Sequence, residues 1–229
     1  MRNYLTEFIG TFFLVLTIGL TVLGGTELAP LAIGSSLMIM VYMGGHVSGG
    51  HYNPAVSLAV LLRGKMASAG EFVGYVVSQC AGAVVAALVV YFIVGRTFAP
   101  APAATASVAA SLLVELLYTF ALALVVLNSA ASAKTHGNSF FGLAIGFTVV
   151  VAAFAGGPIS GGAFNPAVGF GPILVDTVLG GGSLANLWIY IVAPLAGGAL
   201  AATVFGMQER EAVNLHAEPA RKPESRPAA

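Results

Sequence analysis

Charge is what this chain most lacks. Asp, Glu, Lys and Arg make up only 8% of its 229 residues, whereas 58% are hydrophobic. So few charged residues cannot cover the surface of a soluble protein of this length, and the composition therefore predicts an integral membrane protein in a lipid bilayer. The nine basic residues are balanced by nine acidic ones, and there is no basic patch that would bind nucleic acid.

Cysteine is nearly absent, and so are the clusters that metal binding or catalysis requires. The single Cys80 lies inside an apolar run, which excludes a disulfide within the chain. His46 and His51 have no Asp, Glu or third His near them, so we expect neither a metal nor another cofactor. No nucleophile is paired with a base, which argues against an enzyme.

Long apolar runs are what the chain has instead. Six of them approach the ~20 residues that a helix needs to cross ~30 Å of hydrocarbon, and they lie at roughly 4–23, 30–46, 70–94, 108–128, 139–156 and 186–207. Two more, 54–62 and 166–175, reach only half as far. We predict one all-α membrane domain over 1–207, with halves at about 1–98 and 108–207, and a disordered cytoplasmic tail over 208–229.

A nine-residue segment occurs twice in the chain. Residues 48–56 read SGGHYNPAV and residues 160–168 read SGGAFNPAV, identical at seven positions. In each copy an Asn stands directly before a Pro and a short apolar stretch, which is typical of a helix start with Asn as the N-cap. Non-helical backbone at membrane depth must be buried in protein or line a watery cavity, so both segments are predicted to be re-entrant and to surround a pore.

The distribution of basic residues predicts the orientation. With the N-terminus in the cytoplasm, only Arg96 of the nine Lys and Arg residues lies outside. The others lie inside: Arg2, Arg63, Lys65, Lys134, Arg210, Arg221, Lys222 and Arg226. We therefore expect both termini in the cytoplasm and the protein in the cell membrane. Three spans per half also place the halves in opposite orientations, as an inverted repeat.

Two carboxylates occupy corresponding points of the halves, Glu7 in the first span and Glu115 in the fourth. A carboxylate within the membrane is costly unless it has partners. We expect each to accept hydrogen bonds from the backbone of the re-entrant loop in its own half, and so to anchor that loop. For Glu7, near the chain end, the alternative is a carboxylate that reaches the membrane interface.

The two loops predict the chemistry of the pore. Asn53 and Asn165 would meet near the midplane, at helix N-termini that each carry about +0.5 charge and repel cations. Each side-chain oxygen would cap its own helix, while the NH2 group would face the lumen and hold a passing oxygen. Backbone carbonyls of the loops would supply acceptors; these are expected from Gly49, Gly50, His51, Gly161 and Ala163.

With these features the chain resembles the major intrinsic protein family, the aquaporins and glycerol facilitators. The resemblance covers about residues 4–207 and rests on Glu7, Glu115 and two Asn-Pro-Ala motifs, Asn53-Pro54-Ala55 and Asn165-Pro166-Ala167. It implies a right-handed bundle of six transmembrane helices plus two re-entrant half-helices, one pore per subunit, and a homotetramer.

One position departs from the family pattern. Most members carry an Arg three residues after the second Asn, where this chain has Val168. The other filter positions implied by the resemblance are Ile33, Ala153 and Gly162, and a shift of one residue would exchange Ala153 for Phe154. We predict a wide apolar filter that passes water and small neutral solutes such as ammonia, urea, glycerol or hydrogen peroxide.

Two alternatives stay open. A glycerol-type facilitator would typically continue its second motif with Arg and Asp, where this chain has Val168 and Gly169. An inverted-repeat secondary transporter would need groups to coordinate a coupling ion, and the only intramembrane carboxylates in view already have a structural role.

Overall fold

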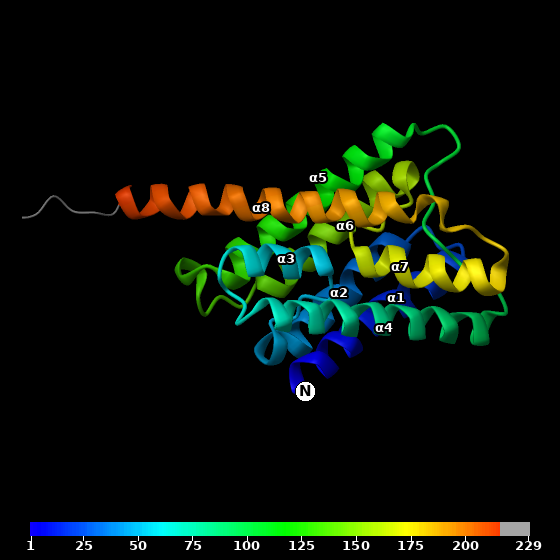
Figure 1. Ribbon diagram of the computed structural model, residues 1–229, viewed down its shortest axis with the longest axis horizontal. Coiled ribbons are helices and arrows are strands. Elements are labelled where there is room, and N and C mark those ends of the chain that lie inside the picture. Colours follow the sequence, from blue (N-terminus) through cyan, green and yellow to red (C-terminus); the bar gives the residue numbers. More distant parts are fainter. Residues whose placement is uncertain (216–229) are drawn as a thin grey trace, which may run out of the picture.

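The computed structural model describes residues 1–215, and the surroundings of side chains through residue 209. Its described part is helical, without strands, and six helices are long and apolar enough to cross a membrane (Figure 1). These are α1 (Arg2–Leu23), α2 (Ala29–Ser48), α4 (Ala69–Val94), α5 (Val108–Val126), α6 (Phe141–Ser160) and α8 (Leu187–Leu215). The two half-length helices are α3 (Pro54–Leu62) and α7 (Pro166–Val175). The predicted architecture of six spans and two half-helices is confirmed.

Glycines set the closest helix crossings, and they do so in the same way in both halves. A Cβ on Gly82 of α4 would lie 2.5 Å from the backbone oxygen of Phe8 in α1. A Cβ on Gly197 of α8 would lie 2.5 Å from that of Leu116 in α5. Since only glycine permits such an approach, α1 with α4 and α5 with α8 form equivalent pairs.

Each half-helix begins at an Asn. Asn53 and Asn165 have extended backbone, and their side-chain oxygens accept the N–H groups of Ala55 at 2.8 Å and Ala167 at 2.9 Å. The following Pro has no N–H to leave unsatisfied, so it suits the first helical position. Figure 1 shows α3 and α7 lying roughly end to end in the middle of the bundle, between α4 and α8. The two half-helices together therefore cover the depth of one span.

Helix α8 extends further than the sequence predicted. The disordered tail was expected from residue 208, but α8 continues to Leu215. Side-chain hydrogen bonds hold the first two residues of this extension: Asn128 donates to Gln208 at 3.0 Å, and Ser132 donates to Glu209 at 2.7 Å. Residues 216–229 lie outside the described part, and with them the rest of the predicted tail.

Candidate pore

The first re-entrant loop is bound to a carboxylate buried within the bundle. Glu7 is 0% exposed, and its two oxygens accept the backbone N–H of His51 at 3.0 Å and of Tyr52 at 2.7 Å. Side-chain donors complete the set, from Ser48 Oγ at 2.6 Å and Gln79 Nε2 at 2.8 Å. Four donors occupy the acceptor sites of this carboxylate, so Glu7 is held inside the bundle as an anchor of the loop.

The second loop repeats the arrangement with fewer partners. Glu115, also 0% exposed, accepts the N–H groups of Ala163 at 3.0 Å and Phe164 at 2.6 Å, and the hydroxyl of Ser160 at 2.8 Å. The loop hydrogen bonds expected from the sequence are thus present in both halves. Buried N–H groups of an irregular backbone need such acceptors, because the surrounding hydrocarbon offers none.

Two tyrosines brace the starts of the loops. The hydroxyl of Tyr75 in α4 donates to the backbone oxygen of Ser48 at 2.7 Å, and that of Tyr190 in α8 donates to Ser160 at 2.5 Å. These two bonds occupy the same place in the two halves. No sequence signal pointed to them, because the tyrosines lie far from the loops along the chain.

The two Asn side chains are bonded across the repeat rather than turned wholly into the lumen. Asn53 Nδ2 donates to the backbone oxygen of Phe164 at 2.9 Å, and Asn165 Nδ2 donates to that of Tyr52 at 2.8 Å. The acceptor residues have φ of 48° and 49°, an uncommon left-handed conformation for a side chain of this size. One N–H of each amide is therefore committed to the opposite loop, and one is left for the lumen, which corrects the expectation that both would face it.

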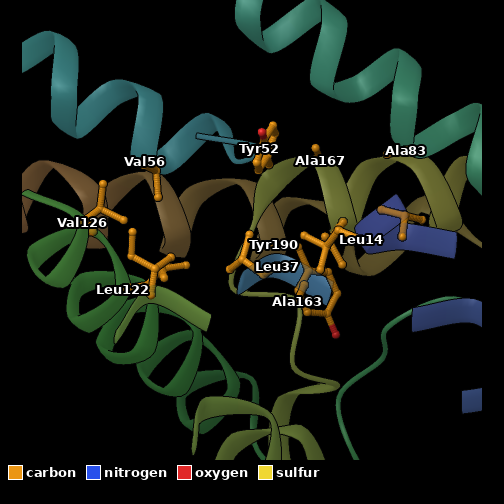
Figure 2. Packing of buried hydrophobic residues seen from close by; sticks show 14 of the residues in the cluster. Leu14, Leu37, Tyr52, Val56, Ala83, Leu122, Val126, Ala163, Ala167 and Tyr190 are labelled. Atoms are coloured by element: carbon orange, nitrogen blue, oxygen red, sulfur yellow. The ribbon is translucent and has the colours of Figure 1, made fainter. Parts of the chain in front are cut away.

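A cavity of about 360 Å³ runs past both Asn residues. Its lining includes the four positions expected to form the filter: Ile33, Ala153, Gly162 and Val168. Of the two residues considered for one filter position, Ala153 lines the cavity, whereas Phe154 is 51% exposed and is not among the lining residues. Figure 2 shows Val56 of α3 beside Leu122 and Val126 of α5, and all three also line the cavity.

The loops supply the polar part of the lining. His51, Gly161 and Ala163 line the cavity, whereas Gly49 and Gly50 are outside the set of residues that touch it. In the second loop Gly161 and Gly162 have φ of 89° and 67°, which glycine adopts without strain. Lys, Arg, Asp and Glu are all absent from the described lining. The cavity wall therefore combines apolar side chains, loop backbone, two amides and one imidazole.

The family is decided by the extent of the match. The Major intrinsic protein family model matches residues 1–205. The chain belongs to this family. Members of the major intrinsic protein family are channels and not enzymes, so this major intrinsic protein is a membrane channel.

The known relatives of this major intrinsic protein include both a glycerol uptake facilitator and aquaporins. It is 36% identical over 217 residues to glycerol uptake facilitator protein-like 6 of Lactiplantibacillus plantarum, with 88% of the chain and 95% of the relative covered. It is 35% identical over 222 residues to aquaporin TIP2-3 of Arabidopsis thaliana, with 90% and 86% covered. The aquaglyceroporin of Plasmodium falciparum shares the fold, with a TM-score of 0.83 at 22% identity over 93% of this chain and 98% of that one.

Proposed function

We propose that this protein is a passive channel for water and small uncharged solutes, among them ammonia, urea, glycerol or hydrogen peroxide. Solutes pass the filter of Ile33, Ala153, Gly162 and Val168 and then the two Asn residues. The observation that carries the proposal is a cavity that meets all four filter positions and both Asn residues without a charged side chain in its described lining. A constriction built from small and branched apolar residues admits solutes wider than water, because no guanidinium fills it.

Cation exclusion rests on the two half-helices. The N-termini of α3 and α7 each present about half a positive charge toward the lumen, and the second N–H of each Asn amide is aimed at passing oxygen atoms. The NH2 groups of Asn53 and Asn165 donate to the oxygen of a passing water molecule. This orients the water and so interrupts a continuous hydrogen-bonded chain of waters. Without an Arg at position 168, this barrier is lower than in relatives that have one.

The experiment is a solute-reflection measurement on reconstituted proteoliposomes. Vesicles are mixed with sucrose, glycerol or urea as osmolyte, and their volume is followed by light scattering. A channel of the proposed kind shrinks vesicles in sucrose, and in glycerol or urea it shows shrinkage followed by re-swelling as the solute enters. Complete reflection of every solute, with only water crossing, refutes the wide filter.

A glycerol-type facilitator is the second candidate, and one observation favours it. The relative from Lactiplantibacillus plantarum, named as a glycerol uptake facilitator, is matched over 95% of its length. Glycerol flux that exceeds urea flux in the same assay supports this assignment. A secondary transporter is distinguished by a proton gradient, which drives accumulation in a transporter and leaves channel flux unchanged.

We further propose a homotetramer in the cell membrane with both termini in the cytoplasm. The tetramer follows the family pattern, and the orientation follows the basic residues. Native mass spectrometry in detergent tests the assembly. Protease accessibility of a tag after Ala229 in right-side-out vesicles tests the orientation, since a cytoplasmic tag is protected.

A further inference from the structure

A chain of buried hydrogen bonds leads from Glu7 to the imidazole in the cavity wall. Gln79 Nε2 donates to Glu7 Oε2 at 2.8 Å and to Ser57 Oγ at 3.0 Å. Ser57 Oγ in turn lies 3.0 Å from His51 Nδ1. Glu7, Ser57 and Gln79 are all 0% exposed, so water does not compete for these bonds.

The direction of each bond in this relay follows from its donors and acceptors. The other three partners of Glu7 all donate to it, so Gln79 turns its NH2 group toward this acceptor, and the opposite orientation would set oxygen against oxygen. That leaves Gln79 Oε1 buried without a partner. Both N–H groups of the Gln79 amide are then in use, one of them on Ser57.

Ser57 therefore accepts from Gln79 and has its own proton to donate. The described residues offer the Ser57 hydroxyl no acceptor other than His51 Nδ1. If Nδ1 were protonated instead, the Ser57 proton would be left buried without an acceptor, which is costly. Nδ1 is thus the acceptor, and in a neutral imidazole the proton resides on Nε2.

The Nε2 atom of His51 has no partner among the described residues. His51 lines the cavity and is 9% exposed. This nitrogen is neither hydrogen-bonded nor among the buried unpaired atoms of the described structure, so it keeps accessible surface. A protonated Nε2 is therefore a donor available to a solute in the lumen.

The second half has no such relay. Ala163 corresponds to His51 in the duplicated loop, and Gly169 corresponds to Ser57. Counting from the equivalent Tyr75 and Tyr190, Pro194 corresponds to Gln79. The relay is therefore an addition to one half and not a part of the shared loop architecture.

We propose that Ser57, which also accepts a hydrogen bond from Gln79, is a positioning residue that holds His51 in the Nε2–H tautomer, and that this places an N–H donor for the oxygen of a passing solute in the lumen beside the first loop. Solutes with a carbonyl oxygen gain most, because apart from the two Asn amides the described lining is apolar or offers backbone acceptors. The proposal rests on the proposed function, since a donor in the lumen matters only if solutes pass.

The test reads the tautomer directly by ¹⁵N NMR of histidine-labelled protein in liposomes. Replacing His46, His136 and His216 with Asn leaves His51 as the only imidazole, and protonated and bare ring nitrogens differ widely in shift. At about pH 8 an ordinary imidazole is neutral, and we expect Nε2 protonated and Nδ1 bare. Protonated Nδ1 in this background overturns the relay.

Ser57→Ala is the informative variant, and Ser111→Ala is its matched control. Both remove a buried hydroxyl, but that of Ser111 has no hydrogen-bond partner. Ser57→Ala should add a second population with protonated Nδ1, whereas Ser111→Ala should leave the spectrum unchanged. If Ser57→Ala folds poorly, Ser57→Cys keeps a side chain of similar shape but donates weakly, and it carries the same expectation in smaller measure. A spectrum unaffected by either Ser57 variant refutes the positioning role.

Flux provides the second measurement. Loss of the Nε2–H donor of His51 should lower the ratio of urea to water permeability about fivefold, which corresponds to ~1 kcal/mol for one hydrogen bond. A shifted tautomer with an unchanged ratio overturns the role in conduction. Wild-type vesicles that pass no solute at all refute the proposed function instead, and the NMR result then still decides the relay.

Discussion

Replacing Val168 with Arg restores the charge that most of the family has at this point of the filter. Val168 is 4% exposed and shares the cavity wall with Ile33 and Gly162, so a guanidinium there would lie about 4 Å from a permeating ion. At an effective dielectric constant of about 20, a unit charge at that distance raises the barrier to a monovalent cation by ~4 kcal/mol. This corresponds to a decrease in cation conductance of about a thousandfold.

The same variant also narrows the pore. The Arg side chain is longer than Val and occupies part of the cavity of about 360 Å³, so glycerol and urea permeability should fall while water still crosses. Val168→Met is the control that separates size from charge: it should reduce solute flux and leave the cation leak as it is. Potential-sensitive dye measures the leak, and light scattering measures solute and water flux on the same vesicles.

Two results would refute the reasoning for Val168. Unchanged urea and glycerol permeability in the Arg variant means that this residue does not line the constriction. A leak reduced equally by Arg and Met means that width rather than charge controls cations, and the half-helices then carry the whole electrostatic barrier.

Three further variants test other parts of the pore. Asn165→Asp keeps the cap but loses the donor to the opposite loop and adds a negative charge, so proton leak measured with an internal pH dye should rise; an unchanged leak contradicts the role of the amide. Glu115→Gln turns an amide NH2 group toward a loop N–H and should lower stability by about 1–3 kcal/mol, which is measured as a lower Tm in detergent. The control Glu27→Gln, at an exposed site, should leave the Tm unchanged. Gly82→Ala forces α1 away from α4 and should lower the free energy of unfolding by about 1–3 kcal/mol. Gly70→Ala is the control and should change it little, because its Cβ meets only a side-chain oxygen at 3.6 Å. Equal Tm values for the two variants would show that the helices move apart without cost.

Local patterns were enough to predict the helices and their ends. Apolar run length gave all six spans, and Asn followed by Pro gave the starts of α3 and α7. The role of Glu7 and Glu115 was also accessible, because a membrane offers a buried carboxylate few partners and an irregular loop few acceptors. These inferences need only the length of apolar runs, the helix-start residues and the cost of unpaired polar groups.

The interactions across the bundle could not be predicted in the same way. Asn53 meets the Phe164 carbonyl across 111 positions of sequence, and the relay from Gln79 to His51 joins three elements. Tyr52 is buried with its ring against Gly10, a fit that depends on the relative placement of two helices. The extension of α8 likewise depends on partners in another part of the chain, so polar composition alone predicted its end too early.

The crossed Asn bonds have a consequence for how the protein is made. Asn53 is synthesised well before the residue that accepts its N–H, since Phe164 follows 111 positions later. Until the second half has entered the bilayer, the first loop has a polar amide and an open carbonyl that hydrocarbon cannot satisfy. The hydrogen bonds of the first half-helix are therefore completed only when α7 and its loop have entered the bilayer. A chain that ends after the third span lacks the partners of Asn53 and Tyr52 and leaves both groups unpaired.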